Sequence, residues 1–213
     1  MLTLWGRLNS HNVKKVAWLA EEIGAAIGTR FDWRRVDMGG KFGFTDEYLA
    51  MNPNRMIPTI SISGGEDDGF VLWESNAILR YMAARYTPSL WPENPRERAR
   101  GDKWMDWMFH FADAQRDAFL GHVRHTPDQR NHEAIARSVQ ASCTMMEILD
   151  AELAGRPWLS GDSFGIADIP MGVYAHTFFA LPIERPALAH VEEWHGRLRL
   201  RPGYARQVAI PLT

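Results

Sequence analysis

The strand and helix patterns of this chain stop alternating near residue 86, and this break limits the possible folds more than any other feature. Up to that point, short apolar runs typical of strands alternate with segments whose apolar residues recur every three or four positions, as on one face of a helix. Thr87–Pro95 then contains three prolines in nine residues, and only helical patterns follow. We therefore predict an α/β domain over 1–86, a linker over 87–94 and an all-helical domain over 95–213.

The first domain is predicted to contain one four-stranded mixed sheet with helices. Strands are expected at Leu2–Trp5, Phe31–Val36, Ile57–Ile62 and Phe70–Trp73, and helices at 13–23, Asp46–Met51 and Ser75–Arg85. A helix between the first two strands implies a parallel pair, because such a pair needs a crossover. The glycine-rich segment 64–69 between the last two strands implies an antiparallel pair. We expect Gly24 to end the first helix.

The second domain is predicted to be all-α. Helix starts are expected at Asn94-Pro95 and at Thr126-Pro127, because Asn or Thr can cap a first turn and proline suits the first helical position. Apolar stripes predict further helices at 135–153, 166–179 and 187–200.

Charge balance and cysteine content exclude several classes of protein. Lys and Arg total 24 and Asp and Glu total 26, which gives a net charge of −2 and argues against nucleic-acid binding. No apolar run reaches the roughly 18 residues that a membrane span needs, and we see no signal peptide. Cys143 is the single cysteine, and His122 and His125 have no evident third ligand, so we expect no disulfide and no metal. A reducing cytoplasm is the expected location.

Five segments carry a family resemblance through their order and spacing. They are Leu4–Val13, Tyr48–Asn54, Met56–Thr59, Trp73–Ile78 and Arg201–Tyr204. In this order they resemble the cytosolic glutathione transferase family, in the style of a bacterial-type member, over essentially the whole chain. The resemblance implies a thioredoxin-like N-terminal domain that binds glutathione and an all-α domain that contributes the pocket for a second substrate.

The resemblance also implies where glutathione binds. Pro58 is expected to follow a cis peptide bond, which turns the backbone of Ile57 outward to pair with an extended peptide. Glu74 offers a negative partner for an ammonium group, and Ser75 lies at a helix N-terminus, which suits a carboxylate. Without the resemblance, Pro58 is an edge-strand proline and Ser75 is a helix N-cap.

The turn between the first strand and the first helix is expected to activate the glutathione sulfur. Ser10 occupies the position where several classes of the family have serine or cysteine, and Asn12 matches the asparagine of some bacterial members. We favour Ser10 as the donor to the sulfur, with Asn12 as the first alternative and the backbone amides alone as the second. Both side chains can also simply cap the helix. No cysteine or tyrosine is available in this turn.

The rest of the implied site is less specific. Lys41 and Arg7 are candidates for the glycyl carboxylate and the mouth of the site, although each can equally be a solvated surface charge. Four residues on one helix are candidates for the acceptor pocket: Trp104, Trp107, Met108 and Phe111. An aromatic stripe of this kind usually belongs to the core.

The implied activity is the transfer of glutathione to a small hydrophobic electrophile, in the manner of a detoxification enzyme. A glutathione-dependent peroxidase or disulfide reductase on the same site is an alternative, and a non-catalytic glutathione-binding scaffold is another. The resemblance also implies a homodimer, which is the commonest oligomer.

Asp168 is predicted to be structural. Gly165 stands three residues earlier, where the family has Ser or Thr, and Asp168 can reach back to its N–H. From this local pattern alone, Asp168→Ala should lower stability by roughly 1–2 kcal/mol.

Overall fold

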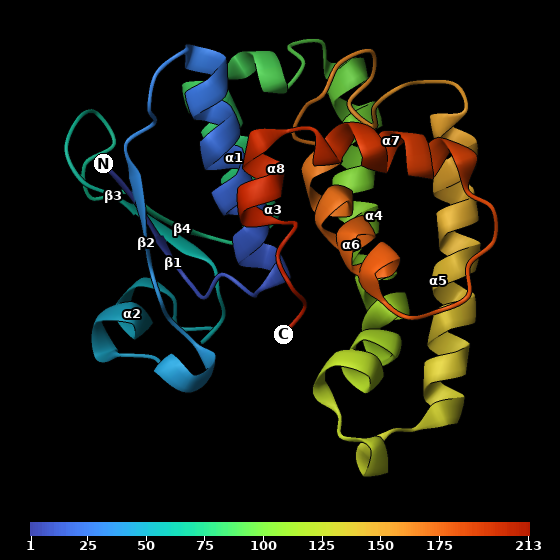
Figure 1. Cartoon of the computed structure of the whole chain (residues 1–213). Helices are drawn as coiled ribbons and strands as arrows, with labels where there is room; N and C mark the ends of the chain where they lie inside the picture. Colours follow the sequence, from blue (N-terminus) through green and yellow to red (C-terminus); the bar gives the residue numbers. More distant parts are fainter.

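The four strands form one mixed sheet, as the sequence predicts (Figure 1). Their order in the sheet, β2-β1-β3-β4, comes from the structure. They are β1 (Leu2–Trp5), β2 (Trp33–Val36), β3 (Thr59–Ile62) and β4 (Val71–Trp73). β1 pairs in parallel with β2 and antiparallel with β3, and β3 pairs antiparallel with β4. The computed structural model describes residues 1–213.

Three helices accompany the sheet: α1 (His11–Ile27), α2 (Asp46–Met51) and α3 (Ser75–Tyr86). The prediction that α1 ends at Gly24 is wrong, because the helix continues to Ile27 and Gly28 ends it with a φ of 68°. Gly24 is instead a point of close approach. A Cβ there would lie 3.3 Å from the backbone nitrogen of Phe31.

The second part of the chain is helical throughout. Its α-helices are α4 (Pro95–Phe119), α5 (His132–Leu153), α6 (Asp168–Ala180), α7 (Ala189–Arg199) and α8 (Pro202–Gln207). Asn94 caps α4 through the N–H of Arg96, as predicted. Thr126 also caps a helix start with Pro127 in the first position, as predicted, but the helix is a short 3-10 turn over Pro127–Gln129. α5 begins at His132, where Asn131 accepts from the N–H of Ala134.

One hydrophobic core extends across both parts of the chain, so the division at 87–94 stays a prediction. Residues 13–20 of α1 are all buried, because this helix packs against α3 of its own part and against α6 and α8 of the other. Figure 1 shows α8 beside α1, between the sheet and the helices α4, α5, α6 and α7. None of the helices combines the length and the apolar character that crossing a membrane requires.

Candidate active site

The loop before β3 exposes a backbone segment without internal partners. The Ile57–Pro58 peptide bond is cis, as the resemblance implies. The backbone N–H and C=O of Ile57 pair with no other backbone group. Asn52 holds the loop in place, because its amide donates to the carbonyl of Met56 and to the hydroxyl of Thr59, both at 3.1 Å. The unpaired groups of Ile57 are therefore presented on a fixed loop, where an extended peptide can pair with them.

The start of α3 carries the next pair of predicted residues. Glu74 has a φ of 72°, an uncommon conformation for a residue with a side chain, and such conformations cost of order 1–3 kcal/mol and cluster at functional sites. Ser75 is not the N-cap, because Glu74 occupies that position and the helix begins at Ser75. The hydroxyl of Ser75 donates instead to Oδ1 of Asn12, at 3.3 Å.

The start of α1 contains both candidates for contact with sulfur. Ser10 occupies the N-cap position, but its side chain accepts no capping hydrogen bond. Its hydroxyl is therefore not used by the helix. Asn12 lies in the first turn and reaches α3 through Ser75.

A narrow cleft of about 40 Å³ brings together five of the twelve predicted site residues. Its lining includes five predicted residues: Asn12, Ile57, Pro58, Glu74 and Ser75. Ser10 does not line this cleft. Four kinds of group thus meet in this cleft: an amide, an unpaired backbone segment, a carboxylate and a helix N-terminus. They come from three separate stretches of the sequence.

Arg7 and Lys41 line a second cavity, of about 460 Å³. Arg124 joins them, and Asp37 is the one carboxylate of its lining and pairs with Arg35. The excess of positive charge suits an anionic group. Gly39 lies close to a lining residue of each cavity, because a Cβ there would lie 3.2 Å from Nη1 of Arg7 and 3.5 Å from Cδ1 of Ile57. Arg124 escaped the sequence analysis because it lies far along the chain, in a π-helical turn over Leu120–Arg124.

The predicted acceptor-pocket residues of α4 lie mostly inside the core. Met108 and Phe111 are fully buried and Trp104 is nearly so, which leaves Trp107 as the partly exposed member. Phe111 packs against Tyr174 and Phe178 of α6. None of the four lines either cavity described above. The role of Trp104, Trp107, Met108 and Phe111 at an acceptor pocket therefore stays a proposal.

Lys15 is a site residue that the sequence analysis missed. It is fully buried, and its ammonium group donates to Oδ1 of Asn12 at 2.8 Å. Burial lowers the pKa of Lys15 to about 7, and the negative charge of Glu74 opposes this shift. The available signal was its place three residues after Asn12, since residues at that spacing share a helix face.

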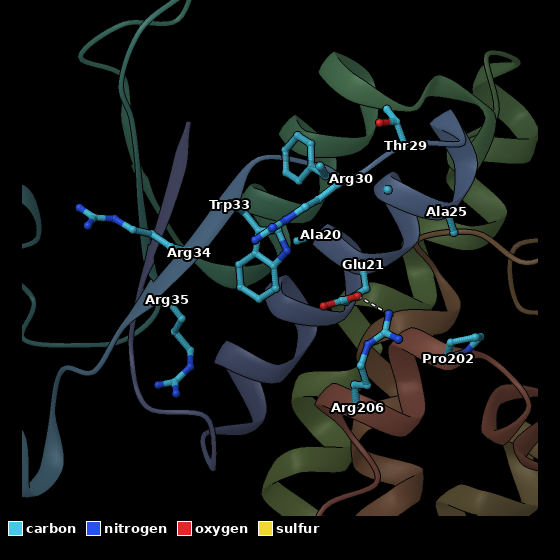
Figure 2. A pocket seen from close by; sticks show the side chains of 12 residues that line it. Ala20, Glu21, Ala25, Thr29, Arg30, Trp33, Arg34, Arg35, Pro202 and Arg206 are labelled. Atoms are coloured by element: carbon cyan, nitrogen blue, oxygen red, sulfur yellow. Dashed lines mark hydrogen bonds and ion pairs between the residues drawn. The ribbon is translucent and has the colours of Figure 1, made fainter.

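A cavity of about 720 Å³ lies away from this site, between α1, β2 and α8 (Figure 2). Arginines dominate its charged lining, but they do not converge on one point. Arg206 pairs with Glu21 beside the cavity, whereas Arg34 and Arg35 point away from that pair. We therefore assign the candidate active site to the clefts around Asn12 and Arg7.

Known proteins are similar to this chain in sequence and in fold. Residues 9–85 match the family model of the glutathione S-transferase N-terminal domain. The glutathione S-transferase GstB of Escherichia coli is 36% identical over the full length of both chains. The disulfide-bond oxidoreductase YfcG of Escherichia coli is 31% identical over 79% of this chain and 78% of its own length.

A solved structure is also similar over the whole chain. It is the theta class glutathione S-transferase of Xanthomonas axonopodis pv. citri with glutathione bound, with 45% identity and a TM-score of 0.91 over 100% of this chain and 99% of that one. The fold is therefore a thioredoxin-like domain followed by a helical one. This chain belongs to the glutathione transferase family.

Proposed function

We propose that the protein is a glutathione transferase that activates the thiol of bound glutathione for attack on a small hydrophobic electrophile. The observation that carries this proposal is the convergence of Asn12, Ile57, Glu74 and Ser75 on one cleft. Family membership supports it, and the Xanthomonas axonopodis relative was solved with glutathione bound. A cytoplasmic detoxification role is part of the same proposal.

Each part of the tripeptide has a matching group in this arrangement. The N–H and C=O of Ile57 pair with the backbone of the cysteinyl residue, as in the addition of a strand to a sheet edge. The free backbone N–H groups at the N-terminus of α3, which begins at Ser75, donate to the γ-glutamyl carboxylate, and Glu74 pairs with the ammonium group. Arg7 and Lys41 attract the glycyl carboxylate. In this arrangement, activation of the glutathione thiol requires no metal ion.

Two measurements test this function. Calorimetry should detect glutathione binding, and conjugation to an aryl halide should release the halide with wild-type protein. Glu74→Gln keeps the size of the side chain but removes its charge, so glutathione should bind about tenfold more weakly. Glu47→Gln, an exposed change in α2, is the matched control and should leave the affinity unchanged. Wild-type protein that neither binds glutathione nor turns over would contradict the proposal.

A glutathione-dependent disulfide reductase or peroxidase is the second candidate, because the similar protein YfcG is named a disulfide-bond oxidoreductase. In that reaction the glutathione thiolate attacks a disulfide sulfur or a peroxide oxygen in place of an electrophilic carbon. Turnover of a mixed disulfide or a peroxide that greatly exceeds aryl-halide conjugation would select this candidate. Binding of glutathione without any turnover would select a non-catalytic scaffold.

We expect the protein to be a homodimer in which the N-terminal part of one subunit packs on the helical part of the other. β4 is an edge strand of the sheet, and the apolar side chains of Phe70 and Trp73 beside and within it are 38% and 40% exposed. A partner subunit would cover such an edge. Sedimentation should give twice the mass of one chain at micromolar concentration. A species of 24.3 kDa would contradict this prediction.

A further inference from the structure

The side chain of Lys15 lies where both parts of the chain meet. It is fully buried, and its ammonium group approaches three polar atoms: Oδ1 of Asn12 at 2.8 Å, Oγ of Ser75 at 3.4 Å and Sδ of Met108 at 3.5 Å. The rings of Phe109 and Tyr174 each have their centroid 5.5 Å from Nζ. Groups from α1, α3, α4 and α6 thus surround one ammonium group.

Stability alone does not account for a lysine at this position. Burying an ammonium group is costly unless a carboxylate is paired with it, and Lys15 takes part in none of the ion pairs of the protein. The charge of Glu74 offsets the cost of burial only in part, since the pKa of Lys15 is still lowered. Lys15 also lies near the N-terminus of α1, where the helix dipole disfavours positive charge. An apolar side chain would fit a surround of Met108, Phe109 and Tyr174 at lower cost.

The hydrogen bonds of Lys15 fix the orientation of the Asn12 side chain. Nζ of Lys15 donates to Oδ1 of Asn12 at 2.8 Å, so the carbonyl oxygen is the atom of Asn12 that faces it, and the charged form, which has donors only, requires this orientation. Ser75 donates to the same oxygen, at 3.3 Å. The NH2 group of Asn12 is therefore held on the side away from Lys15, and Asn12 lines the cleft together with Ile57 and Glu74.

We propose that Lys15 is a positioning residue for thiol activation, which holds Asn12 so that its NH2 group donates to the sulfur of bound glutathione. This inference rests on the proposed function. Without the ammonium group, the amide of Asn12 can rotate and present its carbonyl oxygen, which repels a thiolate.

Lys15→Met tests this role. Methionine replaces the ammonium group with an apolar end of similar length, and such replacements of buried charge are often neutral for stability. The pKa of bound glutathione, read from thiolate absorbance against pH, should rise by about one unit because a donor to the charged form is lost. The pH profile of kcat/KM should shift by the same amount. The affinity for S-methylglutathione, which has no ionisable thiol, should change less than about twofold.

Lys14→Met is the matched control. Lys14 is the adjacent lysine of α1 and is also buried, but its ammonium group donates to the carbonyl of Val208, away from the cleft. This variant should leave the pKa of the bound thiol unchanged. Lys15→Gln retains an N–H donor without the charge, so the pKa of the bound thiol in this variant should stay close to the wild-type value.

A double-mutant comparison shows whether Lys15 acts through Asn12. Coupled residues give non-additive effects, so Lys15→Met should add almost nothing to the thiol pKa in an Asn12→Ala background. An equal shift in both backgrounds would overturn the proposal, as would a Lys15→Met protein with the wild-type thiol pKa. A loss of S-methylglutathione affinity without a pKa shift would also overturn it. Failure of the proposed function is distinguishable, because then wild-type protein would bind no glutathione.

Discussion

Asp168→Ala is expected to lower the free energy of unfolding by about 3–5 kcal/mol, because several buried hydrogen-bond donors lose their acceptor. The carboxylate is fully buried at the start of α6 and accepts four hydrogen bonds. The donors are the backbone N–H groups of Leu159 at 2.8 Å, Ser160 at 3.3 Å and Gly165 at 3.1 Å, and the indole Nε1 of Trp194 at 2.9 Å. Alanine would leave these donors buried without an acceptor, so the loss exceeds the roughly 1–2 kcal/mol that the local pattern predicts.

Denaturant unfolding followed by tryptophan fluorescence measures this loss. The thermal midpoint should also fall by roughly 10 °C, since each kcal/mol is worth about 2–4 °C at this chain length. Asp162→Ala, at an exposed position in the same loop region, is the control and should have little effect. Glutathione affinity of folded Asp168→Ala should be unchanged, because Asp168 lines neither cleft. An Asp168→Ala protein as stable as wild type would disprove the structural role.

Asn12→Ala should raise the pKa of bound glutathione by at least about one unit. A free thiol has a pKa near about 8.5, and lowering it to about 6.5 requires about 2.7 kcal/mol in favour of the thiolate. One hydrogen bond to a charged group supplies about 1.5–3 kcal/mol, and the N-terminus of α1 adds about 0.3–1 kcal/mol. One side-chain donor and the helix end are therefore sufficient.

The structure favours Asn12 over Ser10 as the hydrogen-bond donor to the glutathione sulfur. Sequence position favours Ser10, but Asn12 lines the cleft and has its amide oriented by Lys15 and Ser75. We therefore propose Asn12 as the main donor and expect Ser10→Ala to give the smaller shift. The measurement is thiolate absorbance against pH in both variants. A shift confined to Ser10→Ala would return the role to Ser10 and would also contradict the proposed role of Lys15, whereas no shift in either variant would leave the backbone as the donor.

Local sequence signals predicted individual elements well where periodicity and caps agree. Leu2–Trp5 and Asp46–Met51 have the predicted bounds, and Asn94 caps α4. The errors in the predicted bounds concern helix ends that are set by tertiary packing. Gly24 looks like a helix end, but it serves the close approach of Phe31, and the prediction that α6 begins at residue 166 is two residues early.

Gly165 shows how packing overrides a capping pattern. The capping pattern expects Ser or Thr at this position, yet α6 begins at Asp168 with Ala167 as its N-cap, and a Cβ at Gly165 would lie 2.6 Å from the carbonyl oxygen of Leu90. The segment before α6 therefore lies too close to the turn after α3 for any side chain. This contact joins residues far apart in the sequence, so no local pattern reveals it.

The sequence by itself determined the order of strands and helices along the chain, the mixed character of the sheet and the family resemblance. Periodicity, caps and short motifs are properties of neighbouring residues, so the sequence contains them directly. Only the tertiary structure decided which buried polar groups meet. In the sequence, Lys15 is marked only by its place three residues after Asn12, and Asp168 only by its place three residues after Gly165. Their contacts with Ser75, Met108 and Trp194 span 60, 93 and 26 positions along the chain. Such contacts arise when helices pack around a shared core, and a buried charge is then constrained by partners that its sequence neighbours do not specify.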